Sequence, residues 1–122
     1  YAGMPCFFIR LAGCNLNCNF CDTAYSKPPE SGEERTVSDV AAEAQESGLR
    51  LAEVTGGEPL FQSATPTLCR KLMRKGFTVL VETNGSLPIS LLPVETIKIL
   101  DCKTPSSGEH EKMDFMKKTS LY

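Results

Sequence analysis

Four short, mostly apolar runs recur along the sequence, and an unusual motif follows each of them directly. The runs read as strands and lie in segments 5–13, 49–57, 77–85 and 96–105. Helix-forming stretches at 37–47 and 65–76 separate the first three. Strands that alternate with helices predict an α/β fold with a parallel sheet built by right-handed crossovers. Because ligands of such sheets bind beyond the carboxyl ends of the strands, the four motifs should share one site.

The starts of the two predicted helices carry capping signals. Thr36 or Ser38 can cap the first helix, and Gly48 ends it. The second helix is predicted to begin with Thr65 as its N-cap and with a proline in its first turn. Between the last two strands, residues 87–95 predict an irregular segment or a brief helical turn.

The motif after the first strand, "GCNLNCNFCDTAY", places Cys14, Cys18 and Cys21 at the spacing C-x3-C-x2-C. Three thiolates this close can wrap one compact soft metal centre. A structural zinc site needs four ligands, but there is no second C-x-x-C pair, and the only histidine, His110, lies in a distant polar segment. A zinc site would need a ligand from elsewhere. An iron–sulfur cube held by three cysteines leaves one iron without a protein ligand, where a small molecule can bind.

The sequence contains three further cysteines, which are not clustered. Cys6, Cys69 and Cys102 lie in apolar or strand-like surroundings, so we expect buried thiols. Small secreted domains held by disulfides are usually denser in cysteine and poorer in helix and strand patterns. The cysteine pattern therefore favours a reducing, cytoplasmic location.

The composition excludes several functional classes. The 122 residues carry a formal net charge of −2, which gives no electrostatic case for nucleic acid or an anionic membrane as a partner. No apolar run approaches the roughly 20 residues that span a bilayer, and no signal peptide is visible. The length suits one domain over residues 1–122. Because the chain starts at tyrosine and ends abruptly, we expect that N-terminal and C-terminal segments are missing from it.

The cysteine triplet followed by "GGEP" resembles the radical S-adenosylmethionine (SAM) superfamily. Four segments together are more specifically similar to the 7-carboxy-7-deazaguanine synthase family: "PCFFIRLAGCNLNCNFCDTAY", "EVTGGEPLFQ", "VETNGS" and "DCKTPSSGE". They span residues 5–109. The resemblance implies a partial (β/α)6 barrel, of which this chain supplies only a part.

The resemblance also implies an activity. A [4Fe–4S] cluster and S-adenosyl-L-methionine would generate a 5′-deoxyadenosyl radical, with Mg²⁺ as a further cofactor. The reaction would be that of a carbon–nitrogen lyase, which converts 6-carboxy-5,6,7,8-tetrahydropterin to 7-carboxy-7-deazaguanine with loss of ammonia. The product feeds queuosine and related deazapurine biosynthesis. Expected partners are the carboxypterin substrate, an electron donor such as flavodoxin or ferredoxin, and a second copy of the chain in a homodimer.

Residue roles follow from the matched motifs. The resemblance makes Cys14, Cys18 and Cys21 the cluster ligands and Thr23 a magnesium ligand. A hydroxyl suits Mg²⁺, which prefers hard oxygen ligands and keeps several waters. From the sequence alone, a local hydrogen bond in which Thr23 caps the loop is an equal alternative. No protein side chain is expected to act as a catalytic acid or base.

Arg10 and Thr55 match substrate contacts in the family. We expect apolar neighbours to bury Arg10, and a buried guanidinium needs an anionic partner, such as the substrate carboxylate. The alternative is a strand residue that faces solvent beside Phe8.

The other matched residues are expected to hold S-adenosylmethionine: Gly57, Glu58, Asn84, Asp101, Cys102 and Lys103. The two glycines of "TGGEP" would let the backbone approach a ligand closely, and Glu58 could accept a hydrogen bond from an ammonium group. Turn residues with a partly buried lysine are the alternative interpretation for the last four.

Two other functions remain open at this point. One is an activase of the same superfamily that makes a glycyl radical on a partner protein, although Arg10 and Thr23 favour a small carboxylated substrate. The other is a cluster or zinc module without catalysis. The "GGEP" motif argues against it, because an electron carrier needs no loop that binds an amino acid.

Overall fold

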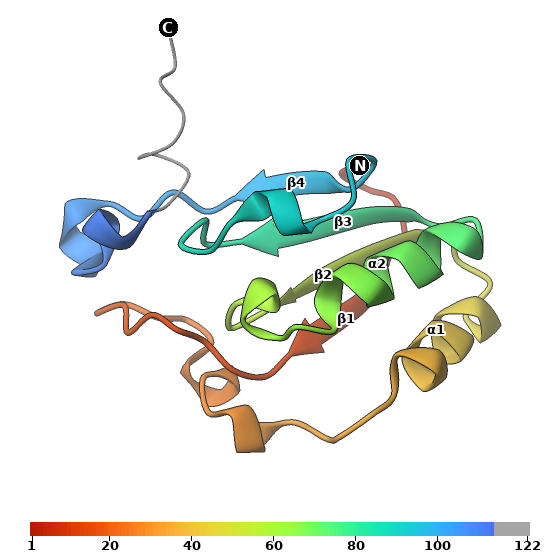
Figure 1. The fold of residues 1–122 in the computed structure, drawn as a ribbon, viewed down its shortest axis with the longest axis horizontal. Coiled ribbons are helices and arrows are strands. Elements are labelled where there is room, and N and C mark those ends of the chain that lie inside the picture. The colour runs from red at the N-terminus through yellow and green to blue at the C-terminus, as the bar shows by residue number, and fades with distance from the viewer. Residues whose placement is uncertain (114–122) are drawn as a thin grey trace, which may run out of the picture.

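The computed structural model describes residues 1–113, and its centre is a four-stranded parallel sheet (Figure 1). The strands are β1 (Phe7–Leu11), β2 (Leu51–Gly56), β3 (Thr78–Thr83) and β4 (Ile97–Leu100). They lie side by side in chain order, and each neighbouring pair is parallel. The predicted α/β fold, the parallel sheet and the four strands are confirmed. Such a sheet is consistent with part of a (β/α)6 barrel.

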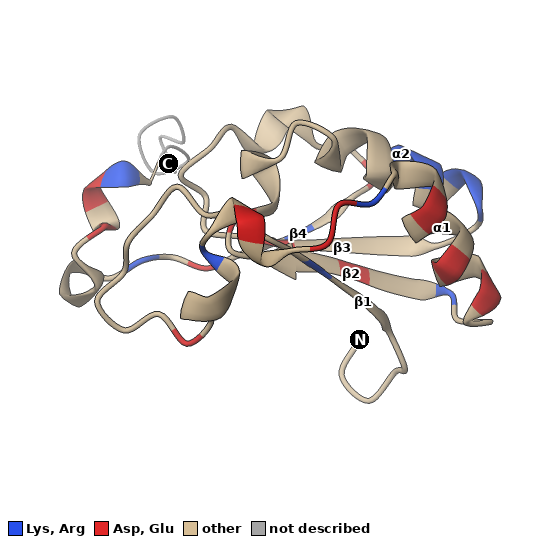
Figure 2. Ribbon diagram, turned by 90° about the horizontal axis from the view of Figure 1, so that it is seen from below, with Lys and Arg blue, Asp and Glu red and all other residues tan. Residues whose placement is uncertain are grey.

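Two α-helices cover one face of the sheet. They are α1 (Val37–Glu46) and α2 (Thr65–Arg74), and Figure 2 shows both on the same side of the strands. The core between helices and sheet includes Ala44, Val54 and Leu72, whose side chains are fully buried. A single 3-10 turn at Ile89–Leu91 connects β3 with β4, as the irregular segment 87–95 predicted.

The helix caps agree with the sequence in one case and differ in the other. The Thr36 hydroxyl accepts a hydrogen bond from the backbone N–H of Asp39 at 3.1 Å, which confirms Thr36 as the N-cap of α1. The prediction for Thr65 is wrong, because Ala64 is the N-cap of α2. Thr65 is a buried helical residue whose hydroxyl donates to the carbonyl oxygen of Pro59 instead. It ties the helix to the turn that precedes it.

The other face of the sheet carries no α-helix within residues 1–113. Strand alternation places Phe8 and Arg10 on this face, paired in register with Glu53 and Thr55 of β2. Phe8 is 51% exposed, and Arg10 is also exposed. The expected burial of Arg10 is therefore wrong, because its side chain points away from the helices, as the alternative interpretation held. In a barrel of this kind the helices lie outside, so this face corresponds to the interior side.

In the part of the chain that the structure describes, no helix is both long and apolar enough to cross a membrane.

The three cysteines outside the triplet have different environments. Cys69 is buried in α2, and burial raises the pKa of its thiol to about 11. Cys6 is half-buried, and Cys102 is exposed. The expected burial of Cys102 is wrong because β4 ends at Leu100, so Cys102 already lies in the loop beyond the sheet.

Alkylation of the protein distinguishes these thiols. Under native, reducing conditions at about pH 8, we expect iodoacetamide to modify Cys102 readily and Cys69 only after unfolding. The raised pKa keeps the Cys69 thiol protonated until well above this pH, and the thiolate is the reactive form. Peptide mass spectrometry over a time course measures both rates. Equal rates for Cys69 and Cys102 in the folded protein would contradict the placement of α2 in the core.

Candidate cluster and ligand site

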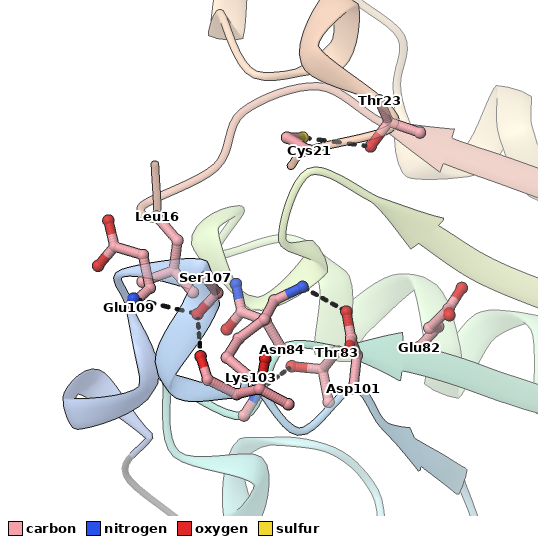
Figure 3. Close-up of polar contacts among 12 residues, drawn as sticks. Leu16, Cys21, Thr23, Glu82, Thr83, Asn84, Asp101, Lys103, Ser107 and Glu109 are labelled. Carbon is pink, nitrogen blue, oxygen red and sulfur yellow. Dashed lines mark hydrogen bonds and ion pairs between the residues drawn. The ribbon is translucent and has the colours of Figure 1, made fainter. Parts of the chain in front are cut away.

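The loops after all four strands meet around one cavity of about 320 Å³ at the carboxyl edge of the sheet. All predicted site residues except Glu58 and Cys102 line it. Figure 3 shows Cys21 and Thr23 on one side of the site and Asn84, Asp101 and Lys103 on the other. The structure thus brings together residues that are up to 93 positions apart, Arg10 and Lys103 being the outermost (103 − 10 = 93). The convergence expected from the strand pattern is present.

The cysteine loop starts directly after β1. Gly13 turns the chain with φ +97°, and its N–H donates to the carbonyl oxygen of Ser26 at 2.8 Å. Cys14, Cys18 and Cys21 are half-buried. Burial is the main reason that the pKa of the Cys14 thiol is raised. The N–H of Leu16 donates to the Cys14 sulfur at 3.4 Å, a contact that lowers the pKa and favours the thiolate.

The three thiols line one cavity, which is the arrangement that a centre of several atoms requires. In residues 1–113, no three His, Cys, Asp or Glu side chains converge closely enough to hold a single metal ion. A [4Fe–4S] cluster needs three thiolates and room for a further ligand on the fourth iron. The cysteines and the adjoining cavity fit this group.

Gly56 and Gly57 allow the "GGEP" turn to pack directly on the cysteine loop. A Cβ on Gly57 would lie 2.4 Å from the carbonyl oxygen of Gly13 and 2.7 Å from the Cβ of Cys14. Gly56 has φ +147°, and a Cβ there would lie 2.0 Å from the carbonyl oxygen of Leu11. The two glycines were expected to let the backbone approach a ligand closely. In the structure they let it approach the protein's own backbone, at Leu11 and Gly13. Any side chain at Gly57 would push this turn away from Cys14.

Glu58 is fully buried, with 0% of its surface exposed. One carboxylate oxygen accepts hydrogen bonds from the Leu60 N–H at 2.9 Å and the Thr83 hydroxyl at 2.7 Å, and the other accepts from the Asn84 N–H at 2.8 Å. The side chain therefore holds the end of β2 to the end of β3. Its predicted contact with a cofactor ammonium group stays a prediction.

The Thr23 hydroxyl makes one local contact in the cysteine loop. The residue precedes the 3-10 turn Ala24–Ser26, but its side chain makes no capping hydrogen bond. Its carbonyl oxygen accepts the N–H and hydroxyl of Ser26 instead, both at 2.9 Å. The Thr23 hydroxyl lies 3.9 Å from the Cys21 sulfur and lines the cavity. The side chain therefore does not cap the 3-10 turn, but its contact with the Cys21 sulfur is itself a local hydrogen bond, so the magnesium role of Thr23 stays a prediction.

Arg10 and Thr55 line the same cavity from the sheet. The Arg10 guanidinium lies 5.1 Å from the ring centroid of Phe8 and 5.8 Å from that of Tyr25. Among the described ion pairs, no carboxylate pairs with Arg10. The Thr55 hydroxyl donates to Glu82 at 3.0 Å.

Glu82 is a cavity residue that sequence reasoning missed. Glu82 is half-buried on β3, where it pairs in register with Ile99 of β4. The available signal was a carboxylate inside the apolar strand "FTVLVET", at a position that alternation turns away from the helices. The described hydrogen-bond partner of Glu82 is the Thr55 hydroxyl, which lines the same cavity.

The loop after β4 contributes an ion pair. Lys103 and Asp101 are bonded to each other, and both line the cavity. Burial lowers the pKa of Lys103, but the hydrogen bond and the charge of Asp101 raise it more, so the pKa is raised overall. Lys103 therefore stays protonated at neutral pH. Asn84 completes this wall, with its amide nitrogen 4.0 Å from the Cys14 sulfur. Cys102 does not line the cavity, so its predicted cofactor contact has no support from the geometry.

Comparison with known proteins adds the family. A sequence profile described as the Radical SAM superfamily matches residues 8–101. The chain belongs to the radical SAM superfamily. This membership implies the [4Fe–4S] cluster and S-adenosylmethionine as cofactors, and the cysteine loop and its cavity fit both. When bound, the pair supplies radical chemistry that no protein side chain can.

Several curated proteins are similar to this radical SAM chain, and each is named 7-carboxy-7-deazaguanine synthase. The protein of Koribacter versatilis is 40% identical over 111 residues, which are 89% of this chain and 48% of the relative. That of Methanospirillum hungatei is 41% identical over 94% of this chain and 49% of the relative. The protein of Chlorobaculum tepidum is 41% identical over 91% of this chain and 50% of the relative. The chain spans about half the length of the curated relatives it matches.

Replacement of Gly57 by alanine tests the packing of the turn on the cysteine loop. Because the new Cβ would overlap the Gly13 carbonyl, we expect the affinity for the cluster to fall by about 10- to 100-fold. Iron and sulfide content after anaerobic reconstitution measures this. Gly48→Ala is the matched control, since a Cβ there meets no atom within 4 Å although φ is also unfavourable at +72°. Full cluster content in Gly57→Ala would contradict the proposed contact.

Proposed function

We propose that the protein to which this chain belongs converts 6-carboxy-5,6,7,8-tetrahydropterin to 7-carboxy-7-deazaguanine with loss of ammonia, in queuosine and related deazapurine biosynthesis. The observation that carries this proposal is the set of residues that line a single cavity. It joins the three cluster cysteines to Arg10, which has no ion-pair partner among residues 1–113, and to a carboxylate, Glu82. The names of the relatives contain the proposed product, 7-carboxy-7-deazaguanine.

Arg10 suits the carboxylate of this substrate. Its guanidinium is exposed toward the cavity, is held by two aromatic rings, and lacks a carboxylate partner among residues 1–113. A guanidinium fork binds a carboxylate through two parallel hydrogen bonds, which fixes orientation as well as position. The substrate's acid group would therefore be anchored at β1, next to the cysteine loop.

Glu82 and Thr55 suit the other end of the substrate. An aminopyrimidinone ring presents an amino group and a ring N–H on one edge, and a carboxylate can accept both. Glu82 already accepts the Thr55 hydroxyl through one oxygen at 3.0 Å, which orients the carboxylate in the cavity. Anchors at Arg10 and Glu82 would hold the ring between them. Such positioning matters because a radical abstracts the hydrogen atom nearest to it.

The remaining cavity residues suit S-adenosylmethionine. Gly57 leaves backbone accessible next to Cys14, and the charged pair of Asp101 and Lys103 offers partners for a ribose and a carboxylate. Asn84 lies between these groups and the cysteines. The glycine and the three polar side chains would hold the cofactor against the cluster.

Product formation tests the proposal directly. The full-length protein would be reconstituted anaerobically and mixed with S-adenosylmethionine, Mg²⁺, dithionite and 6-carboxytetrahydropterin. Dithionite replaces the flavodoxin or ferredoxin that we propose as the donor. We expect mass spectrometry to detect 7-carboxy-7-deazaguanine. If only 5′-deoxyadenosine forms, the superfamily chemistry stands and the proposed substrate is rejected.

Thr23→Ala tests the proposed magnesium ligand. Because the hydroxyl makes no capping bond, its loss should leave the loop and the cluster intact and weaken the dependence of the rate on Mg²⁺. Turnover over a magnesium titration, with iron content measured in parallel, checks both parts. Thr67→Ala, at an exposed position of α2, is the control. If Thr23→Ala lost as much iron as Cys18→Ala, the hydroxyl would serve the loop rather than the metal.

A further inference from the structure

The segment after β4 lies directly against the cysteine loop, and it contacts the residues on both sides of Cys18. The N–H of Asn17 donates to a carboxylate oxygen of Glu109 at 2.8 Å. The N–H of Asn19 donates to the carbonyl oxygen of Ser107 at 3.0 Å, and its side-chain amide donates to that of Ser106 at 3.2 Å. These contacts join residues that lie 87 to 92 positions apart in the sequence.

The cysteine loop depends on such contacts because it lacks regular structure. Between β1 and the 3-10 turn that starts at Ala24, the structure assigns neither helix nor strand. Buried or half-buried backbone N–H groups need acceptors, and within this loop they cannot come from a helix or a sheet ladder. The later segment supplies acceptors to two N–H groups of the loop, those of Asn17 and Asn19, although both residues are exposed.

The segment itself is rigidly built. Ser107 is 0% exposed; its hydroxyl donates to the Thr104 carbonyl at 2.6 Å and accepts the Glu109 N–H at 3.1 Å. Gly108 turns the chain with φ +76°, and a Cβ there would lie 3.3 Å from the Asn19 amide nitrogen. The positive φ favours glycine at this turn, and the short distance shows how closely the turn approaches the Asn19 side chain. Figure 3 shows Ser107 and Glu109 together next to Leu16 of the cysteine loop.

Glu109 is the one charged member of this contact. It is 6% exposed, although it lies in a loop near the end of the described residues. One oxygen accepts the Asn17 N–H, and the other lies 2.6 Å from the ammonium group of Lys112. Hydrogen bonds to a charged acceptor are roughly twice as strong as neutral ones. Burying a carboxylate costs folding free energy unless the group is paired and hydrogen-bonded, as Glu109 is here.

We infer that Glu109 is a positioning residue for the cluster, which acts by fixing the peptide N–H before Cys18. Together with the Ser106 and Ser107 carbonyls, it holds the middle of the cysteine loop in the shape that presents Cys18 to the cavity. Glu109 does not touch the cluster or a substrate. The inference rests on the cluster that superfamily membership implies, and it is independent of the proposed substrate.

Cluster retention tests this inference in the full-length, reconstituted protein. Iron loss to an excess of an iron chelator is followed anaerobically by the cluster absorbance, without S-adenosylmethionine or substrate. We expect Glu109→Ala to lose the cluster about 10- to 100-fold faster than the parent protein. Glu109→Gln keeps an acceptor for the Asn17 N–H and should lie close to the parent. Glu111→Ala, at an exposed neighbour, is the matched control and should change nothing.

A second variant protects the test against misfolding of Glu109→Ala. Asn19→Ala removes only an exposed side-chain bond to the Ser106 carbonyl, so the fold should persist while the cluster is lost a few-fold faster. The thermal midpoints of the variants without cluster are compared by circular dichroism. Faster cluster loss at an unchanged midpoint supports the positioning role. Parent-like retention in both Glu109→Ala and Asn19→Ala would overturn it, as would equally fast loss in Glu109→Gln and Glu109→Ala. Because no substrate is added, failure of the proposed reaction cannot produce either result.

Discussion

The carboxylate of Glu58 is the interaction on which the geometry of the site depends. It accepts three hydrogen bonds in a fully buried position and thereby fixes the turn after β2 to Thr83 and Asn84 at the end of β3. Its own N–H donates to the Gly13 carbonyl at 2.9 Å, so the cysteine loop joins the same assembly. A hydrogen bond to a charged group contributes about 1.5–3 kcal/mol. One buried residue thus sets the relative positions of three of the four loops.

The parallel sheet explains why these loops carry function. All four strands end at the same edge, where the chain leaves the ladder and its side chains are released from packing. The helices cover one face only, so Arg10 and Glu82 can face the cavity from the strands while the loops supply thiols and hydroxyls. Radical chemistry needs such an arrangement, because the reactive species must meet its substrate before it meets solvent or protein.

The sequence predicted the fold and the location of the site because both follow from local patterns. Apolar runs and glycines identify parallel strands, and the edge where they end follows from topology. Long-range partners were not predictable in this way. The exposure of Arg10 depends on which face the helices cover, and the capping error at Thr65 arose from a bond to a carbonyl six residues earlier. Glu82 lines the cavity and Glu109 holds the cysteine loop, and their hydrogen-bond partners lie 27 and 92 positions away in the sequence, a distance over which local patterns carry no information.

The central claim is that three cysteines hold a cluster with one iron open to S-adenosylmethionine. Electron paramagnetic resonance of the reduced, reconstituted protein tests it most directly, with spectra recorded before and after the addition of excess S-adenosylmethionine. We expect a reduced [4Fe–4S] signal whose g values change when the cofactor binds, because the open iron would gain amino and carboxylate ligands. An unchanged spectrum at saturating S-adenosylmethionine would contradict the claim, since the fourth iron would then already have a ligand or lie out of reach of the cavity.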